Sequence, residues 1–428
     1  MRILIKNGRL VSYNSKELIK VDILIINETI NRIEFALDVD ADIIINATGK
    51  LIFPGFIDVH THLREPGFPH KETILSGTRA AAKGGFTTIF CMANTSPVVD
   101  NTDTYKLILE KSANEGKIKV LPVGAITKGL MGKELSDMLG MKQLGAIALS
   151  DDGHTIKNTQ LMREAIELAG NLNLKIIDHC EDSYLANHGS MREGSCAEKL
   201  IIRGIPAETE DIIVARDIIL AELTGVPIHL AHISSKGSVE LIRRAKANGV
   251  PITAEVTPHH LVLTELDVTL TDTSTKCNPP LGTDSDRSAL IAGIKDGTLD
   301  MIASDHAPHA KYEKNVAYEK APFGMIGLET SVPLVIDRLV HKGLLDWFDL
   351  YRVYYLNAAI AFGLPSSGLF PGSIADITII DQTKKVEISK AFLESKAENS
   401  PFLGLVLMGC ATEAFVNGKL VLQDGKVI

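Results

Sequence analysis

Two histidines separated by a single residue follow a short apolar run near the start of the chain. Residues 56–59, Phe-Ile-Asp-Val, lead directly into His60-Thr-His62. Because side chains alternate between the two faces of a strand, His60 and His62 project from the same face if this run is a strand. Two imidazoles on one wall can bind the same metal ion, so the spacing predicts one part of a metal site.

Histidines and carboxylates also end four later apolar runs. A single such histidine is more often structural, but their repetition at successive run ends is hard to assign to chance. Imidazole and carboxylate ligands suit Zn²⁺, Mn²⁺ and non-haem iron, and this set is large enough for two ions with a position open to water. The residues are Asp152 in Ser150-Asp-Asp-Gly153, His179, His232 and Asp305.

The elements that must position these residues alternate regularly between residues 56 and 360. Eight strand-like apolar runs, separated by helical patterns in about 300 residues, predict a (β/α)8 TIM-type barrel whose active site lies at the carboxyl ends of its strands. An open doubly wound sheet is the alternative. That fold would be expected to carry a Gly-rich phosphate loop, G-x-G-x-x-G, after an early strand, and this chain has no such sequence. The runs are residues 56–58, 86–91, 119–123, 146–149, 175–177, 227–230, 251–256 and 300–303.

The two ends of the chain have a different pattern. Both carry strand-like runs separated by turn signals such as Asn417-Gly, and neither end alone has enough strands for a stable sheet. We therefore expect residues 1–55 and 365–428 to pair into one small, β-sandwich-like domain. Residues 56–364 are then the barrel domain.

The composition narrows the class of protein. The 428 residues are 45% hydrophobic and 23% charged, which excludes disorder as the main state. A net charge of −9 without any basic run argues against nucleic acid or an anionic membrane as a partner. Five scattered cysteines form no C-x-x-C pair, and no apolar stretch suggests a membrane span or a signal-peptide core. We expect a cytoplasmic protein.

Several motifs resemble those of the dihydroorotase family, within the amidohydrolase superfamily of metal-dependent cyclic amide hydrolases. The most specific are residues 54–67, Pro-Gly-Phe-Ile-Asp-Val-His-Thr-His-Leu-Arg-Glu-Pro-Gly, and residues 303–309, Ala-Ser-Asp-His-Ala-Pro-His. The D-x-H-x-H pattern alone marks only the superfamily. The resemblance covers essentially the whole chain, because it extends to residues 92–97, 150–153, 179–182, 232–235, 258–261 and 278–281.

The resemblance implies the reversible cyclisation of N-carbamoyl-L-aspartate to L-dihydroorotate, with loss of water, in de novo pyrimidine (UMP) biosynthesis. It implies that His60, His62 and Asp305 bind the more buried metal and that His179 and His232 bind the second. One or two Zn²⁺ ions per chain are expected, with two favoured. Metal binding lowers the pKa of a water from about 15.7 towards neutrality, and Asp305 then serves as general base and acid.

The group that bridges the two metals departs from the commoner family pattern. Many relatives use a carboxylated lysine, but here the nearest lysines, Lys142 and Lys157, are several residues from the end of the fourth run. The chain resembles the branch with an aspartate in that place, and Asp152 is in register with it. Asp151 has the opposite strand parity, so we expect it to support the turn. The alternative to two tightly bound ions is a site that, without the carbamate, holds one ion tightly and a second ion weakly.

An extra carboxylate separates dihydroorotate from the substrates of hydantoinases, dihydropyrimidinases and allantoinases. A buried anion needs fixed donors, and Arg64 can form a bidentate clamp beside the metal histidines. Asn94 and His309 can add hydrogen bonds, and these three residues match the family's carboxylate-binding set. Further substrate contacts implied by the resemblance are His62, Asn278, Phe323 and Gly324.

Two other features lie near the predicted site. We expect His259 and His260 to be structural, because a Pro-His-His turn also suits packing and capping at the barrel rim. Residues 307–326 are long for a βα loop, and loops of this length are often lids or binding loops.

Three functions stay under consideration. The first is an active dihydroorotase acting on a small-molecule substrate. The second is another cyclic amidase, such as an allantoinase or hydantoinase, against which Arg64, Asn94 and His309 argue. The third is a non-catalytic barrel that assembles with another pyrimidine-pathway enzyme, although such a protein would be expected to lose metal ligands that are all present here. A homodimer and an association with another pathway enzyme both remain open.

Overall fold

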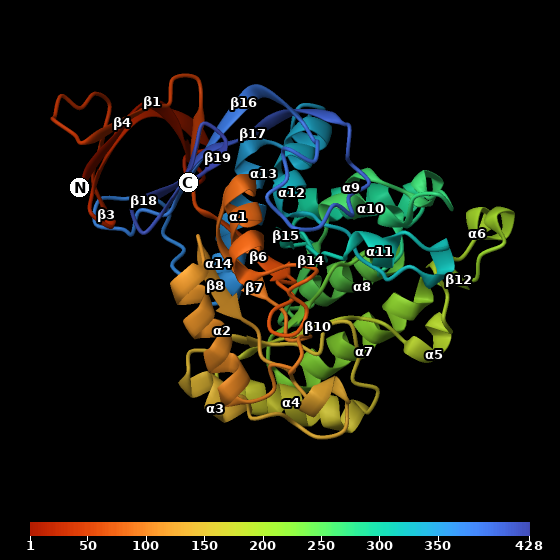
Figure 1. The fold of residues 1–428 in the computed structure, drawn as a ribbon. Helices are drawn as coiled ribbons and strands as arrows, with labels where there is room; N and C mark the ends of the chain where they lie inside the picture. Colours follow the sequence, from red (N-terminus) through yellow and green to blue (C-terminus); the bar gives the residue numbers. More distant parts are fainter.

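The computed structural model describes all 428 residues, and eight parallel strands form its barrel. Several of these strands are labelled near the centre of the molecule in Figure 1. The eight strands form two ladders, β6-β7-β8 and β9-β10-β13-β14-β15. Parallel bridges from Gly124 to Leu149 and from Thr61 to His306 join the ladders on both sides and close the barrel. Each predicted run overlaps one of these strands. The strands are β6 (Phe56–Thr61), β7 (Phe86–Cys91), β8 (Lys119–Pro122), β9 (Ala148–Leu149), β10 (Lys175–Asp178), β13 (Ile228–Leu230), β14 (Ile252–Val256) and β15 (Met301–Ile302).

Helices between the strands cover the outside of the barrel. Capping side chains fix where several of them begin: the Thr283 hydroxyl accepts the Asp286 N–H, and the Asp286 carboxylate accepts the Thr283 N–H. The long helices are α1 (Ile74–Gly84), α2 (Thr102–Glu115), α4 (Thr159–Asn171), α7 (Glu208–Thr224), α8 (Lys236–Ala247), α10 (Asp284–Asp296) and α12 (Leu328–Val335). The short ones are α3 (Met138–Gln143), α5 (Ser183–Ala186), α6 (Ser195–Leu200), α9 (Pro258–Val262), α11 (Lys311–Lys314), α13 (Trp347–Tyr351) and α14 (Asn357–Ala361).

A second sheet combines the two ends of the chain, beside the barrel in Figure 1. Its strand order is β19-β18-β17-β16-β5-β1-β2-β3, with β4 paired to β1, and antiparallel pairing of β5 with β16 joins the two ends. The sheet encloses its own apolar core of isoleucines, alanines, Val21 and Phe415. The strands are β1 (Arg2–Ser12), β2 (Glu17–Ile26), β3 (Thr29–Glu34), β4 (Ile43–Asn46), β5 (Leu51–Pro54), β16 (Ile377–Glu387), β17 (Val406–Val416), β18 (Lys419–Gln423) and β19 (Lys426–Val427).

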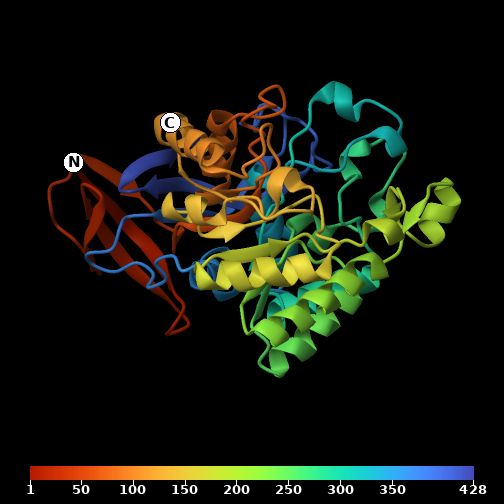
Figure 2. The ribbon, with the colours of Figure 1, turned by 90° about the horizontal axis from the view of Figure 1, so that it is seen from below.

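Two segments leave these sheets. The chain between β10 and α7 carries α5, α6 and the short pair β11 (Met191–Arg192) and β12 (Gly204–Ile205), and it projects from the barrel (Figure 2). Residues 388–405, between β16 and β17, pack on the barrel instead of staying with the terminal sheet. Ile388 and Phe402 share an apolar cluster with the barrel-side residues Cys277 and Leu334. Burial of these apolar side chains accounts for the position of the segment against the barrel.

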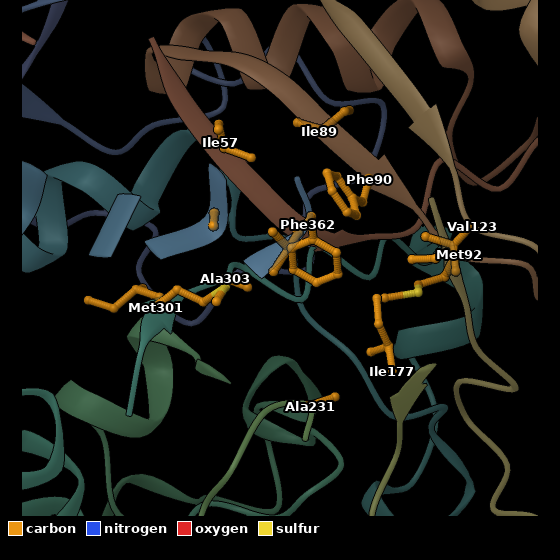
Figure 3. Close-up of a cluster of buried hydrophobic side chains, with 14 of the residues drawn as sticks. Ile57, Ile89, Phe90, Met92, Val123, Ile177, Ala231, Met301, Ala303 and Phe362 are labelled. Atoms are coloured by element: carbon orange, nitrogen blue, oxygen red, sulfur yellow. The ribbon is translucent and has the colours of Figure 1, made fainter. Parts of the chain in front are cut away.

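Apolar side chains fill the barrel beneath the strand ends. Figure 3 shows Phe90 and Phe362 in this core, and their ring centroids lie 4.8 Å apart. The Phe362 ring also lies beside the ring of His229, with centroids 5.3 Å apart. The apolar core of the barrel therefore extends up to His229, a buried histidine on β13. None of the helices combines the length and apolar character of a membrane span.

Candidate active site

Strand β6 and the segment after β15 bring three of the predicted ligands together. His60 lies in β6, His62 comes directly after it, and Asp305 follows β15. The Asp305 Oδ1 atom lies 3.1 Å from His62 Nε2 and 3.7 Å from His60 Nε2. One ligand atom from each of the three residues lies within 4.8 Å of the others, a spacing suited to a shared cation.

Asp152 occupies the centre of the cluster. Its Oδ1 atom lies 3.3 Å from His60 Nε2, 3.5 Å from His232 Nε2 and 3.7 Å from His179 Nδ1. Its Oδ2 atom lies 3.4 Å from His62 Nε2. One carboxylate thus faces histidines from three different strand ends, which is the placement needed to bridge two ions.

Unpaired buried atoms in this cluster fit a metal. His60 Nε2 and Asp152 Oδ1 are buried and have no hydrogen-bond partner in the protein. Buried polar atoms without partners are costly and rare in native proteins. A divalent cation between them would satisfy both, and imidazole with carboxylate is a ligand set that Zn²⁺ accepts.

Asp151 and the nearby lysines point elsewhere. The Asp151 carboxylate accepts the backbone N–H groups of Ile126 and Thr127, at 2.8 and 2.9 Å, and so supports a turn, in agreement with its strand parity. Lys142 Nζ donates to the Asn173 carbonyl, and Lys157 Nζ lies over the Tyr184 ring. Neither lysine contacts the histidine cluster, where a bridging carbamate would have to lie.

Glu255, a buried glutamate that the sequence analysis missed, hydrogen-bonds to His60 on the side of the ring that faces away from Asp152. Glu255 Oε1 lies 2.7 Å from His60 Nδ1, and its Oε2 lies 3.0 Å from His229 Nε2. Burial alone would raise the pKa of Glu255, but the neighbouring His60 and His229 lower it to about 2. An anion here keeps the hydrogen on His60 Nδ1 and leaves Nε2 free for a metal. The available signal was an acidic residue inside the apolar run 251–256.

A cavity of about 230 Å³ opens above the ligands and contains every predicted substrate residue. Arg64 Nε donates to the Pro308 carbonyl at 3.1 Å, and Arg64 Nη2 lies 3.5 Å from His309 Nε2. Burial and the neighbouring Arg64 lower the pKa of His309 to about 2, so its ring is neutral. The cavity is lined by His62, Arg64, Asn94, Asp152, Gly153, His179, His232, Asn278, Asp305, Ala307, His309, Phe323 and Gly324.

Two amide side chains in this cavity adjoin the metal histidines. Asn94 Oδ1 accepts from His62 Nδ1 at 2.9 Å. Asn278 Nδ2 donates to Glu181 Oε2 at 2.5 Å and lies 3.4 Å from His179 Nε2. Both amides therefore lie at the border between the ligand cluster and the space for a substrate.

Three residues of the candidate site have a strained backbone conformation. Arg64, His232 and Asp305 adopt φ angles of 61°, 33° and 44°, in the left-handed region that residues other than glycine rarely enter. Such conformations cost of order 1–3 kcal/mol each and persist where the surroundings enforce them, often at functional sites. Three of the thirteen non-glycine residues with a positive φ therefore line the cavity.

His259 and His260 lie beside the cavity, and the contacts of His260 are structural. His260 Nδ1 bonds to the Thr257 hydroxyl at 2.7 Å, and its Nε2 bonds to the Pro279 carbonyl at 3.0 Å. Burial lowers the pKa of His259 to about 4, so this ring is also neutral. Cys277 is close to both rings, but His260 has no free nitrogen for a metal.

Comparisons with known proteins agree with this geometry. A family model described as dihydro-orotase-like matches residues 49–238. A dihydroorotase from Pelotomaculum thermopropionicum is 47% identical over 99% of both chains. One from Caldanaerobacter subterraneus subsp. tengcongensis is 45% identical over 100% of this chain and 98% of the relative. The chain belongs to the dihydroorotase family.

Solved structures support the same superfamily. An L-hydantoinase (dihydropyrimidinase) from Arthrobacter aurescens has a TM-score of 0.91 at 25% identity, over 100% of this chain and 97% of that one. A dihydropyrimidinase from Brevibacillus agri has a TM-score of 0.86 at 23% identity, over 100% and 96%, and shows the shared fold. The predicted fold, a TIM-type barrel with a β-sandwich domain, is confirmed, and the chain is a hydrolytic cyclic amidase of a metal-dependent family. The comparisons support the dihydroorotase activity and do not favour the allantoinase alternative.

Proposed function

We propose that this cyclic amidase interconverts N-carbamoyl-L-aspartate and L-dihydroorotate in pyrimidine synthesis and that it uses two Zn²⁺ ions. The observation that carries the proposal is the placement of Arg64 and His309 in the same cavity as the histidine and aspartate cluster. The cluster suits cyclic amide chemistry in general. The added guanidinium suits a substrate that also bears a carboxylate.

The proposed ligand assignment is the one that the family resemblance implies, and the short distances in the cluster are compatible with it. His60, His62 and Asp305 would hold one zinc ion, His179 and His232 would hold the other, and Asp152 would lie between them. When bound, zinc lowers the pKa of water and polarises the scissile carbonyl. Glu255 and Asn94 would keep the rings of His60 and His62 oriented through their Nδ1 atoms.

Asp305 is the proposed proton carrier. Burial opposes ionisation, but its contacts with His62 and His60 lower the pKa of Asp305, so its carboxylate is ionised and carries no proton of its own. In hydrolysis, Asp305 takes a proton from the attacking water and gives it to the ring nitrogen as the carbon–nitrogen bond breaks. In cyclisation, it takes the proton of the carbamoyl nitrogen and returns it to the departing water.

Recognition of the substrate carboxylate is assigned to Arg64, Asn94 and His309. The Arg64 Nε atom is held by the Pro308 carbonyl, which orients the guanidinium fork beside His309. A planar fork binds a carboxylate through two hydrogen bonds. Asn278 would contact the substrate from another wall of the cavity. The backbone of Phe323 and Gly324 would contact it beside His309, whose Nε2 lies 2.8 Å from the Phe323 carbonyl.

We expect replacement of Arg64 with alanine to remove the preference for dihydroorotate. The substrate anion would lose its buried partner, at a cost of roughly 2–5 kcal/mol. Arg64→Lys should also be impaired, because a point charge cannot reproduce the two-pronged contact. The test compares kcat/KM for dihydroorotate and for dihydrouracil, the same ring without the carboxylate, in protein of unchanged metal content. Equal discrimination by the wild type and Arg64→Ala would assign the carboxylate to other residues.

We also propose the domain boundaries and the setting of the reaction. Residues 56–364 would be the catalytic barrel, and residues 1–55 and 365–428 the small domain, which the pairing of β5 with β16 supports. A cytoplasmic enzyme acting on a small molecule, without nucleic acid or membrane as a partner, is in keeping with the net charge of −9.

A further inference from the structure

The segment between β16 and β17 reaches the rim of the substrate cavity from outside the barrel. The Ser395 hydroxyl bonds to the carboxylate of Glu72, and Lys396 Nζ bonds to the Pro69 carbonyl, in the turn that follows Arg64. A few residues later, Asn399 enters the base of the loop 307–326. This part of the C-terminal region therefore contacts two of the three segments that carry the proposed carboxylate-binding residues, those of Arg64 and His309.

Asn399 ties together the two ends of the loop 307–326. Its side-chain Nδ2 donates to the carbonyls of Ala307 and Gly324, each at 3.1 Å. Its Oδ1 accepts the backbone N–H of His309 at 3.1 Å. Its own carbonyl accepts the Ile326 N–H at 3.0 Å. Asn399 is 5% exposed, so water competes little for these hydrogen bonds.

These bonds fix the backbone on which substrate recognition depends. His309 and Gly324 line the cavity, and His309 Nε2 lies 2.8 Å from the Phe323 carbonyl. Lys314 supports the same turn by donating to the carbonyls of Pro322 and Gly324, each at 2.9 Å. A loop of this length has many conformations unless it is tied down, and small displacements of positioning groups are costly for binding and catalysis.

We propose that Asn399 is a positioning residue for recognition of the substrate carboxylate, an inference that rests on the proposed function. Asn399 does not line the cavity, so it acts through His309 and the Phe323–Gly324 backbone. It contacts none of the metal ligands. Its loss should therefore weaken binding of the carboxylate-bearing substrate while the chemistry at the metals continues.

The test measures kcat and KM for dihydroorotate and dihydrouracil in Asn399→Ala and Asn399→Asp. Alanine removes all three side-chain bonds. Aspartate keeps an acceptor for the His309 N–H but turns a carboxylate towards the carbonyls of Ala307 and Gly324. For both variants we expect KM for dihydroorotate to rise roughly 10- to 100-fold. Metal content and kcat/KM for dihydrouracil should stay close to the wild-type values, so the preference for dihydroorotate falls.

Asn357→Ala is a matched control. Asn357 Nδ2 also donates to a backbone carbonyl, that of Asp300 at 2.7 Å, before β15 and thus at the opposite end of that strand from Asp305. This variant should lose thermal stability without a change in substrate preference. If Asn399→Ala does not fold, Asn399→Ser, which keeps one hydroxyl, supports the same comparison.

The outcomes separate the inference from the proposed function. Wild-type KM and preference in Asn399→Ala would overturn the role of Asn399, and so would an equal loss of activity on both substrates. A wild-type enzyme without any preference for dihydroorotate would instead overturn the proposed function. A selective rise in KM for dihydroorotate supports both.

Discussion

Replacing Asp305 with asparagine is expected to lower kcat for dihydroorotate hydrolysis by roughly 10²- to 10⁴-fold or more, the usual range for loss of a general acid–base group. Asparagine has the same size and keeps an oxygen that can face His62, but it cannot accept and return a proton. The loss should appear in both reaction directions, because the same carboxylate carries the proton each way. The measurement is kcat in each direction, with metal content determined on the same samples.

Asp22→Asn is the matched control for this substitution. Asp22 is also buried, and its carboxylate accepts the N–H groups of Asn7 and Leu37 in the terminal sheet, far along the chain from the barrel ligands. That variant should lose stability and keep its kcat. Near wild-type turnover by metal-loaded Asp305→Asn would show that another group moves the proton.

Asp152→Asn is expected to remove most of the bound metal and to lower activity by more than roughly 10²-fold. Even partners that only orient metal ligands typically contribute 10–100-fold in affinity or activity, and Asp152 itself faces four histidines. An amide carries no charge to balance two cations. The measurement is metal content after dialysis, together with turnover.

The adjacent Asp151 gives a close comparison. Asp151→Asn makes the same carboxylate-to-amide change one residue away, where the carboxylate accepts the backbone N–H groups of Ile126 and Thr127. It should lower thermal stability while metal content is retained. Equal metal loss in the two variants would contradict the assignment of Asp152 as the bridge.

The barrel and the ligand cluster were predictable because both depend on local patterns. Eight apolar runs define eight strands, and parallel strands in a barrel place their carboxyl ends on one rim. Strand alternation predicted that His60 and His62 face one side and that Asp151 and Asp152 differ. In the structure both histidines face Asp152, and Asp151 binds a turn backbone, although Asp151 and Asp152 lie beyond the end of β9. Residues that the sequence analysis assigned to the substrate, from Arg64 to Gly324, all line one cavity in the structure.

The supporting residues could not be predicted, because their roles depend on contacts between distant segments. Glu255 acts through His60, which lies on a strand from the other ladder. Asn399 belongs to a region that the sequence assigned wholly to the small domain, yet it bonds to His309 in a barrel loop. A single acidic residue in an apolar run is a weak signal for Glu255. No local sequence pattern marks Asn399.

The central claim is that metal held by this cluster is required for dihydroorotate turnover. The most direct test follows metal content and dihydroorotate hydrolysis on one preparation, through exhaustive chelation and then stepwise addition of Zn²⁺. We expect turnover to disappear with the metal and to return in proportion to the zinc bound, up to two ions per chain. An unchanged rate in fully metal-free protein, or a zinc-loaded protein that does not hydrolyse dihydroorotate, would contradict the claim.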